Sequence, residues 1–360
     1  MRAVTMHEFG GEDVLRLEDV PDPVPGPGQV LVRVAAVEVS RTRDVATRTG
    51  RHPFSQFVTL PHILGGDFGG TIEAVGEGVD PGRVGERVAV SNTETCGECE
   101  ACTSGHTEQC ADLTLLGIHK PGSYAELAVI AAENAHPVPA DLSLQEAAAL
   151  AADGAIAFTQ LQVAGVGPGT KLLVTGVTGA LGSTLAALGA HLGADVIGLS
   201  RRPGQVPEGY KLVANLDATD PSLTEALLEA TAGEGLGAVI DNVANPDAFA
   251  AYFPALAIGA RVVFSGAIGN PELPILPVPA APLYVKSISL LGVRTTTLAD
   301  RRRLWELVDA GFRLPAGSLA ELPLEQAAEA HARIQSGAQH GHTLLTVGSA
   351  AAGPSSGESS

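Results

Sequence analysis

The sequence predicts an α/β protein with two domains, a small all-β barrel followed by a doubly wound parallel sheet. Short hydrophobic segments broken by Gly and Pro fill residues 1–130, which is typical of a barrel. From residue 171 onward, strand-like and helix-like segments alternate, which indicates a parallel sheet with helices on both faces. The 360 residues are enough for two separate hydrophobic cores.

The first domain is predicted to be built from short strands. We expect them at residues 3–7, 14–20, 29–39, 70–75, 87–90 and 124–130. A polar stretch at 40–49 follows the third strand and is predicted to be a short helix. We assign residues 1–130 to this domain and expect residues from about 295 to 347 to complete it.

The second domain is assigned to residues 131–294, and a change in character near Ser143 marks the first of its helices. Ser143 and Glu146 have the spacing of a capping box, and an Ala-rich helical region runs from there to about residue 164. The strands expected after it are 171–175, 195–200, 237–243, 260–264, 284–293 and 343–347. The helices expected are 180–192, 222–231, 246–256, 301–310 and 324–336, and the tail 348–360 is expected to be disordered.

The composition excludes some partners. The chain has 40 acidic and 22 basic side chains, a formal charge of -18, which repels nucleic acids and anionic lipid surfaces. We see no apolar run long enough to cross a membrane and no signal sequence after Met1. The sequence therefore predicts a cytoplasmic protein that binds neither nucleic acid nor membrane, and a small molecule is the expected substrate.

All four cysteines lie in one short segment, Cys96, Cys99, Cys102 and Cys110. Two CxxC steps and a return after seven residues can place four thiolates around one tetrahedral zinc ion. Disulfides or reduced thiols are the alternatives, and the last spacing is not that of the common iron–sulfur run. A zinc with four protein ligands has no open position, so we expect it to hold a loop and to take no part in catalysis.

A glycine-rich turn follows the strand predicted at 171–175 and precedes a helix. Glycines at such a turn let the backbone approach a pyrophosphate, whose charge is stabilised by the amino terminus of the helix. The turn therefore predicts a dinucleotide site. Its predicted residues are Gly176, Thr178, Gly179, Ala180, Leu181 and Gly182, with Asn242, Ser265, Gly266 and Ala267 after later strands.

The segment Ser200-Arg201-Arg202 follows the next predicted strand, near the expected position of the adenosine ribose. An NAD site usually has an acidic residue there, whereas two guanidiniums and a hydroxyl suit a 2'-phosphate. The sequence therefore favours NADPH over NADH. The alternative is an ordinary solvated basic turn.

Taken together, the chain resembles the medium-chain dehydrogenase/reductase superfamily over residues 1–347. The resemblance rests on the cysteine lobe, the stretch Leu64–Val79, the segment Gly122–Glu126, the glycine turn and the stretch Gly259–Gly266. It implies a GroES-like barrel domain, a Rossmann nucleotide domain and a structural zinc in the cysteine lobe.

The zinc alcohol dehydrogenases of this group hold a catalytic zinc with three ligands, and this chain has Ser40, Gly66 and Ala152 at those positions. These three residues cannot form an open zinc site. The resemblance therefore shifts toward the quinone and enoyl reductases, although most of those lack the cysteine lobe.

Three residues are predicted to act in catalysis. Ser40 and Thr42 are hydroxyl candidates at the cleft, and the resemblance implies a proton relay for Thr42, although one extra residue leaves the register between Ser40 and Asp44 open by one. Asp153 is a candidate acid with a raised pKa, and a helix-terminal or ion-paired carboxylate is the alternative. Asp67 is expected to bond backbone or an arginine, and Tyr124 to lie in the core. The histidines His119, His331, His340 and His342 are expected at the surface.

The function predicted from the sequence is an NADPH-dependent reductase of an activated carbon–carbon double bond or a quinone, without catalytic zinc. The alternatives are a metal-free carbonyl reductase and a protein that binds NADPH without a redox reaction. The strand expected at 284–293 follows a Pro-rich run, so we expect it at a sheet edge. In similar proteins this edge pairs with a second copy, which implies a homodimer.

Overall fold

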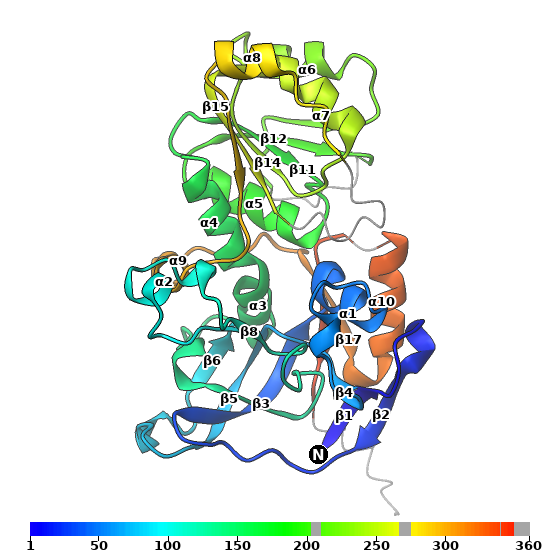
Figure 1. Cartoon of the computed structure of the whole chain (residues 1–360), viewed down its shortest axis with the longest axis vertical. Helices are drawn as coiled ribbons and strands as arrows, with labels where there is room; N and C mark the ends of the chain where they lie inside the picture. Colours follow the sequence, from blue (N-terminus) through cyan, green and yellow to red (C-terminus); the bar gives the residue numbers. More distant parts are fainter. Residues whose placement is uncertain (203–209, 266–274, 339, 349–360) are drawn as a thin grey trace, which may run out of the picture.

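The computed structural model describes residues 1–202, 210–265, 275–338 and 340–348. The chain forms two domains joined by a long helical segment, as Figure 1 shows, with the nucleotide-binding type of sheet at one end and the barrel at the other. The predicted α/β fold is therefore confirmed. Among the described helices, none combines the length and apolar character that a membrane span requires.

The barrel domain contains a large, mainly antiparallel sheet and a small one. The large sheet has the order β10-β6-β5-β3-β18-β17, and β9 also pairs with β3. Its strands are β3 (Gln29–Glu38), β5 (Phe68–Val75), β6 (Arg87–Val90), β9 (Leu127–Ala131), β10 (Ala135–Pro137), β17 (Leu319–Pro323) and β18 (His342–Thr346). The small sheet contains β1 (Arg2–Met6), β2 (Leu15–Asp19) and β4 (His62–Ile63), and β7 (Thr93–Glu94) pairs with β8 (Thr114–Leu115).

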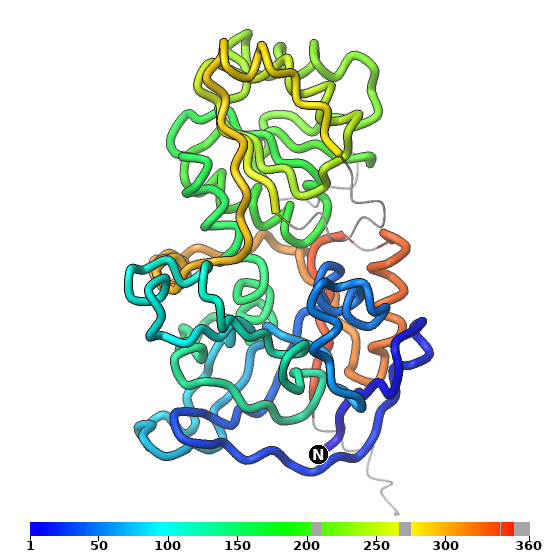
Figure 2. Tube along the Cα trace, in the orientation of Figure 1, coloured from blue at the N-terminus to red at the C-terminus, as the bar shows by residue number. Residues whose placement is uncertain are grey.

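The C-terminal part of the chain returns to the barrel, as the sequence predicts. Strand β18 pairs antiparallel with β3, where Leu345 lies opposite Val37. In Figure 2 this last segment, drawn in red, runs beside the early strands of the chain. The helix α10 (Ala327–Ser336) and the single 3-10 turn at Leu324–Gln326 replace the longer helix expected at 324–336.

A helical segment leads from the barrel to the nucleotide domain. It contains α3 (Leu144–Ala149), a π-helical turn η7 (Leu150–Gly154) and α4 (Ala155–Val163). Ser143 caps the segment, because its side chain accepts a hydrogen bond from the Glu146 amide at 3.1 Å. Strand β10 pairs with β6 and α3 packs on β3 and β5, so the barrel body includes these residues beyond 130.

The nucleotide domain is a parallel sheet with the order β13-β12-β11-β14-β15-β16. Its strands are β11 (Lys171–Thr175), β12 (Asp195–Ser200), β13 (Ala214–Asp217), β14 (Leu236–Asp241), β15 (Leu256–Phe264) and β16 (Ser289–Gly292). Its helices are α5 (Ala180–His191), α6 (Leu223–Ala230), α7 (Pro246–Tyr252), α8 (Ala280–Val285) and α9 (Leu298–Asp309). Strand β13 is not among the strands expected from the sequence.

Both faces of this sheet are covered, because successive side chains of a strand point to opposite faces. On β11, Leu172 packs in the core that includes α4, α5 and α9. Its neighbour Leu173 packs in the core formed with α6 and α7. The sheet is therefore doubly wound, as predicted.

The strand expected at 284–293 is only partly right. Residues Ala280–Val285 form α8, and the strand β16 is limited to Ser289–Gly292. A proline is tolerated in the first turn of a helix, so Pro282 does not prevent α8 from forming. The edge position is confirmed, because β16 is the last strand of the sheet order.

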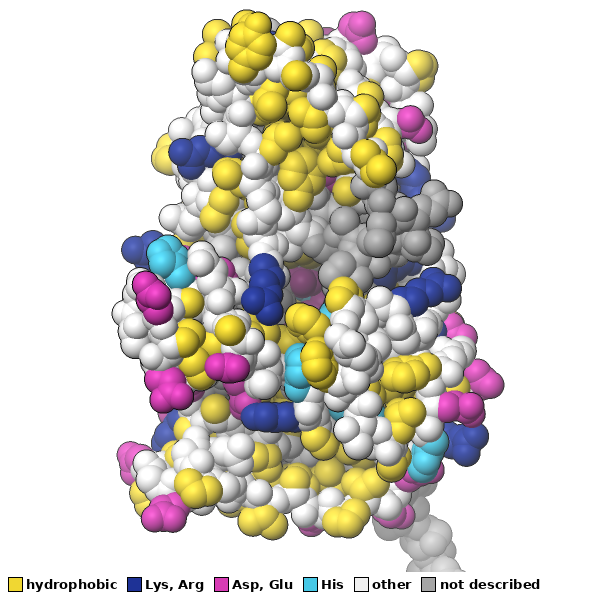
Figure 3. All heavy atoms as spheres, in the orientation of Figure 1, with side chains coloured by type: hydrophobic (Ala, Val, Ile, Leu, Met, Phe, Trp, Pro, Cys, Tyr) yellow, Lys and Arg dark blue, Asp and Glu magenta, His cyan; other side chains and the backbone are white. Residues whose placement is uncertain are grey.

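An exposed apolar patch surrounds this edge. Ile258 is 83% exposed, Tyr284 74% and Val285 66%. Figure 3 shows hydrophobic side chains gathered over the end of the nucleotide domain where Figure 1 places α8. Large exposed apolar patches and unpaired strand edges are typical of protein interfaces.

We predict that the protein is a dimer in solution and that Tyr284→Asp makes it monomeric, since a charge on this patch opposes burial. Light scattering at micromolar concentration measures both masses. The control is Val24→Asp, an equally drastic change at an 84% exposed position of the barrel domain, which should leave the dimer intact. A monomeric wild-type protein would contradict the prediction.

Candidate active site

The glycine turn connects β11 to α5 in the geometry that a dinucleotide requires. Gly176 has a φ of 64°, a conformation that favours glycine. A Cβ atom at Gly182 would lie 2.2 Å from the carbonyl oxygen of Gly176, so any larger residue would push the helix away from the strand. The helix N-terminus is therefore close to the turn, which fits a pyrophosphate.

The other predicted cofactor residues of this turn lie at the same place. Thr178, Ala180 and Leu181 are partly buried around the start of α5. The carbonyl oxygen of Thr178 accepts a hydrogen bond from the Gly341 amide at 3.0 Å. The C-terminal segment before β18 is thus attached directly to the glycine turn.

The end of β12 presents the predicted basic segment. Ser200 is buried, and its Oγ accepts a hydrogen bond from the Arg202 amide at 3.3 Å. Arg201 and Arg202 are exposed, and Nη1 of Arg202 donates to the Gly337 carbonyl at 3.2 Å. Two accessible guanidiniums beside a hydroxyl fit a 2'-phosphate.

The remaining cofactor predictions fall at the ends of β14 and β15. Asn242 exchanges two amide hydrogen bonds with the buried Gln160, at 3.0 and 3.2 Å. Ser265 directly follows β15 and is partly buried. Gly266 and Ala267 lie outside the described residues.

The four cysteines converge as the spacing predicts. Their sulfur atoms all lie within 4.8 Å of one another, and all four are free thiols rather than disulfides. Amides of Cys99 and Glu98 donate toward the Cys96 sulfur, and these bonds lower the pKa of Cys96 to about 7. Four sulfur donors at this separation fit a closed tetrahedral zinc.

The cysteine lobe also contacts the start of α9. The Leu298 amide donates to Oγ1 of Thr107 at 3.0 Å, and Arg294 donates to the Glu108 carbonyl at 3.5 Å. Figure 1 shows α2 (Glu100–Thr103) of the lobe beside α9. A zinc in this lobe would therefore stabilise a contact between the lobe and α9, which follows the last strand of the nucleotide sheet.

Ser40 and Thr42 occupy a tight turn after β3. Residues Arg41–Val45 form one π-helical turn, η2, followed by α1 (Ala46–Arg48). The hydroxyls of Ser40 and Thr42 are 3.3 Å apart, and both residues are partly exposed. A π-turn is the ordinary way for a helix to accommodate one extra residue, which accounts for the register that the sequence left open.

Arg43, in this π-turn, is buried in a cluster of charges. Its Nε and Nη2 donate to the two carboxylate oxygens of Asp44, each at 2.9 Å, and its Nη1 donates to Asp67. Nη2 also donates to the Glu38 carbonyl at 3.1 Å. The expectation that Asp67 pairs with an arginine inside the barrel is confirmed.

The same guanidinium excludes a side chain at Gly66. A Cβ atom there would lie 2.5 Å from Nη1 and 2.6 Å from Cζ of Arg43. The resemblance to the zinc alcohol dehydrogenases implies that their histidine ligand would fall at Gly66. In this structure the Arg43 guanidinium occupies the space that a side chain at Gly66 would need.

Asp153 lies in η7, in the middle of the connecting helical segment, and its side chain is 18% exposed. Burial, followed by the nearby Glu38, raises the pKa of Asp153 well above its ordinary value. Its Oδ2 is 3.6 Å from Nδ1 of His342, which in turn is 2.8 Å from Oε1 of Glu38. Figure 3 shows a hollow between the two domains with acidic side-chain atoms at its floor.

The expectation that His331 and His342 lie at the surface is wrong. His342 is fully buried in β18, and His331 is fully buried in α10 with its Nε2 3.0 Å from the Tyr124 hydroxyl. Polar partners from distant parts of the chain satisfy hydrogen bonds of these two histidines and so stabilise the buried imidazoles. No local feature of the sequence reveals these partners. Tyr124 lies in the core, as expected.

His119 is only partly buried and belongs to an aromatic group that sequence reasoning did not identify. Its ring stacks on Phe57 at 5.3 Å and lies 5.4 Å from Phe54, which is 5.5 Å from His52. Burial, followed by the Arg43 charge, lowers the pKa of His52 to about 4. Two histidine and two phenylalanine rings therefore form one group in the barrel domain, close enough to Arg43 for its charge to act on His52.

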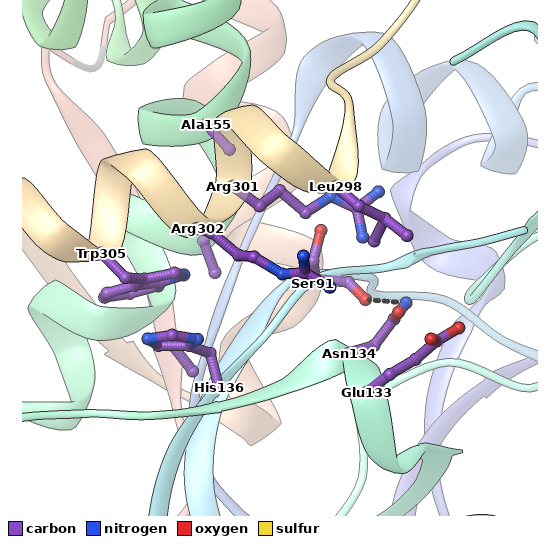
Figure 4. A pocket seen from close by; sticks show the side chains of 11 residues that line it. Ser91, Glu133, Asn134, His136, Ala155, Leu298, Arg301, Arg302 and Trp305 are labelled. Carbon is purple, nitrogen blue, oxygen red and sulfur yellow. Dashed lines mark hydrogen bonds between the residues drawn. The ribbon is translucent and has the colours of Figure 1, made fainter. Parts of the chain in front are cut away.

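A separate cavity of about 80 Å³ lies between α9, the end of β6 and the connecting helical segment. Figure 4 shows its lining from α9, the end of β6 and the loop before β10, with the His136 ring facing Trp305. Arg301 is buried there and donates to the Thr93 carbonyl at 3.0 Å. The cavity borders Ala151, on the same turn as Asp153.

Comparisons with known proteins agree with this architecture. Residues 26–140 match the model of the alcohol dehydrogenase GroES-like domain, and residues 180–310 match the zinc-binding dehydrogenase model. An NAD-dependent alcohol dehydrogenase of Sulfurisphaera tokodaii is 30% identical over 92% of this chain and 95% of that protein. One of Sulfolobus acidocaldarius is 29% identical over 96% of this chain and 100% of that protein.

Solved structures give the same picture. The crystal structure of an NAD-dependent alcohol dehydrogenase superposes with a TM-score of 0.86 at 30% identity, over 97% of this chain and 100% of the other. A crotonyl-CoA carboxylase/reductase, AntE, in complex with NADP has a TM-score of 0.84 at 23% identity, over 96% and 95%. At that identity the second likeness shows the fold alone.

We predict one zinc ion per chain, bound by the four cysteines. Cys110→Ser should lose the ion, because this buried thiolate cannot be replaced by a neutral hydroxyl. Elemental analysis of wild-type protein and variant measures the zinc content. Two zinc ions per wild-type chain would show that a second ligand set exists.

We predict that Arg43→Leu destabilises the fold by about 3–5 kcal/mol, because it leaves two buried carboxylates without their cation. Urea unfolding measures the change in the free energy of unfolding. The control is Arg33→Leu, which removes an exposed pair with Glu73 and should cost less than about 1 kcal/mol. Equal losses in the two variants would contradict the role of the Arg43 cluster.

Proposed function

This chain belongs to the medium-chain dehydrogenase/reductase superfamily, and on that premise we propose that it is an NADPH-dependent reductase of an activated carbon–carbon double bond or a quinone, without catalytic zinc. The family match supports the general class of reaction, oxidoreduction. The choice of double bond and cofactor is our inference from the site.

One observation carries the proposal: the Arg43 guanidinium stands against Gly66, where a zinc ligand would have to lie. It cannot itself act as the electrophile that a metal would be. Its donors are directed at Asp44, Asp67 and the Glu38 carbonyl, and Arg43 is only 8% exposed. The substrate must therefore be activated by neutral donors.

Two such donors are available at the cleft. The hydroxyls of Ser40 and Thr42 lie 3.3 Å apart and are partly exposed, so both can donate to one carbonyl oxygen. An alkoxide concentrates its charge on one oxygen, whereas an enolate shares it between the oxygen and the α-carbon and needs less from each donor. These donors therefore favour the reduction of a conjugated double bond over that of an isolated ketone.

The residues of the nucleotide domain position the cofactor. Bound NADPH supplies a hydride from its nicotinamide ring. The glycine turn from Gly176 to Gly182 brings the start of α5 to the pyrophosphate, and Ser200, Arg201 and Arg202 receive the 2'-phosphate.

A carbonyl reductase that uses the same hydroxyls is the second candidate. The relatives that are 29 and 30% identical over nearly the whole chain are named as alcohol dehydrogenases. Their names favour the interconversion of carbonyl compounds and alcohols. That reaction usually uses a catalytic zinc, and the Arg43 guanidinium fills the space that a zinc ligand at Gly66 would need. A direct comparison of substrates separates the two.

We predict that the double variant Arg201→Ala, Arg202→Ala binds NADPH about tenfold or more weakly, because two charge-assisted bonds to phosphate are lost. NADH affinity should change little. Fluorescence titration of both cofactors measures the effect, with Arg33→Ala on the barrel as a control for the loss of surface charge. An unchanged preference for NADPH in the double variant would refute the assignment of these arginines.

We predict that mild chelation leaves the activity intact and that an enone is reduced faster than the matching saturated ketone. The assay follows NADPH absorbance with an enone, a quinone and a ketone, after a melting curve has confirmed that the chelated protein is folded. Loss of activity in folded protein, or a clear preference for the ketone, favours the alternative. Binding of NADPH without oxidation by any substrate would exclude a reductase.

A further inference from the structure

Three titratable side chains from distant parts of the chain meet beside the cleft. Glu38 ends β3, Asp153 lies in η7 and His342 begins β18, and their ligand atoms all lie within 4.8 Å of one another. We call Glu38, Asp153 and His342 the buried triad. Nε2 of His342 is 2.9 Å from the Thr184 hydroxyl on α5, so the triad also contacts the helix that follows the glycine turn.

The triad is short of positive charge. Two ionised carboxylates beside a neutral imidazole would place two negative charges in the interior, which is costly without a cation. Burial raises the pKa of Glu38 and of Asp153 and lowers the pKa of His342. The charged groups that act on the triad from neighbouring elements are Arg43, Asp44, Asp67 and Glu146.

The one cation in that group is already compensated. Arg43 pairs with both Asp44 and Asp67, and it faces Glu38 through the backbone carbonyl. The triad must therefore reduce its charge in another way, and one proton shared by its two carboxyl groups leaves a single negative charge beside the imidazole. That proton stays there at a pH at which ordinary carboxyl groups are ionised.

The members of the triad differ in their exposure. The side chain of Asp153 is 18% exposed, whereas those of Glu38 and His342 are 3% and 0% exposed. Oε2 of Glu38 is buried and accepts no hydrogen bond from an N–H or hydroxyl donor among the residues that the structure describes, and the carboxyl groups of Glu38 and Asp153 lie within hydrogen-bonding reach of each other. The two carboxyl groups can therefore share a proton, and Asp153 is the more exposed member that can pass it to a substrate.

We propose that Asp153 is the proton donor to the α-carbon of the reduced double bond, and that Glu38 and His342 are positioning residues that keep it protonated. This inference rests on the proposed function. The alkene gains hydride from NADPH at its β-carbon, and its π electrons move to the carbonyl oxygen as an enolate. The O–H bond of Asp153 then breaks as the α-carbon–hydrogen bond forms, and solvent returns the proton to Asp153, the exposed member of the triad.

The electrons and protons balance over these reaction steps. NADPH is oxidised to NADP⁺ by loss of a hydride, and the alkene is reduced by that hydride and one proton. The Ser40 and Thr42 hydroxyls hold the enolate oxygen and need not ionise. The Asp153 carboxylate left after each turnover is unstable beside Glu38, which drives its reprotonation.

The test compares pH profiles of kcat/KM for an enone. In wild-type enzyme the rate should fall as the pH rises through the raised pKa of Asp153, because the protonated form is the donor. Asp153→Asn should lower kcat/KM by about 10²-fold or more and remove this decline. Glu38→Gln removes a negative neighbour, so the decline should move to lower pH while the maximal rate stays within about tenfold of wild type.

The control is Glu146→Gln. Burial also raises the pKa of Glu146, but its carboxylate accepts a hydrogen bond from the Leu314 amide and lies outside the triad. Its substitution should leave the rate in place and move the decline less than Glu38→Gln does, because Glu146 acts on His342 from outside the triad. If Asp153→Asn fails to fold, a ¹³C carboxyl titration of wild-type enzyme replaces it, and a protonated carboxyl group should persist at a pH at which ordinary Asp and Glu side chains are ionised.

The outcomes separate the two proposals. If wild-type enzyme reduces no enone at any pH, the proposed function has failed. If it does so and Asp153→Asn keeps the full rate and the same decline, or all carboxyl groups of wild-type enzyme titrate in the ordinary range of Asp and Glu, the proton-donor role is overturned. A second metal ion in wild-type enzyme that Asp153→Asn loses would overturn it too, since the triad would then be a metal site.

Discussion

A guanidinium in a protein interior requires carboxylates within reach. The pairing of Arg43 with Asp44 and Asp67 therefore fixes the positions of several segments around the cleft. Asp44 also accepts hydrogen bonds from the Ser40 amide at 2.7 Å and the Gly65 amide at 3.3 Å. Asp67 accepts another from the Asn92 amide at 2.8 Å. One buried ion cluster therefore fixes the turn that bears the hydroxyls, the glycine stretch opposite it and the segment that leads to the cysteine lobe. Removal of any member would leave an uncompensated charge.

Because the Arg43 cluster occupies this part of the cleft, we assign substrate activation and proton transfer to side chains of other helices and turns. With Gly66 unable to carry a ligand, the cleft retains two hydroxyls on the π-turn and one acid on the connecting helix. The acid depends on His342, a residue of the last strand, which also contacts α5 through Thr184. The Gly341 amide bonds the glycine turn directly. The barrel, the nucleotide domain and the C-terminal return are therefore all needed to build one site.

The sequence predicted best what is encoded locally. The glycine turn, the cysteine lobe and most strands of the parallel sheet depend on residues close together in the chain, and the structure has them where expected. The strand predicted at 284–293 is partly wrong, because the hydrophobic pattern of this segment is equally compatible with a short helix followed by a strand. Strand β13 (Ala214–Asp217) has no β-branched residue, so its sequence does not indicate a strand. The buried triad could not be predicted, because its members are separated by more than a hundred residues and only the fold brings them together. For the same reason His342 was expected at the surface.

The central claim is that the cleft holds Arg43 and protonated side chains where related enzymes hold a metal. Anomalous diffraction at the zinc edge, from crystals of the NADP complex, tests it most directly because it locates each metal ion. We predict one peak per chain, among Cys96, Cys99, Cys102 and Cys110, with the Arg43 guanidinium ordered against Gly66. A second peak in the cleft, near Ser40 or within the buried triad, would contradict the account.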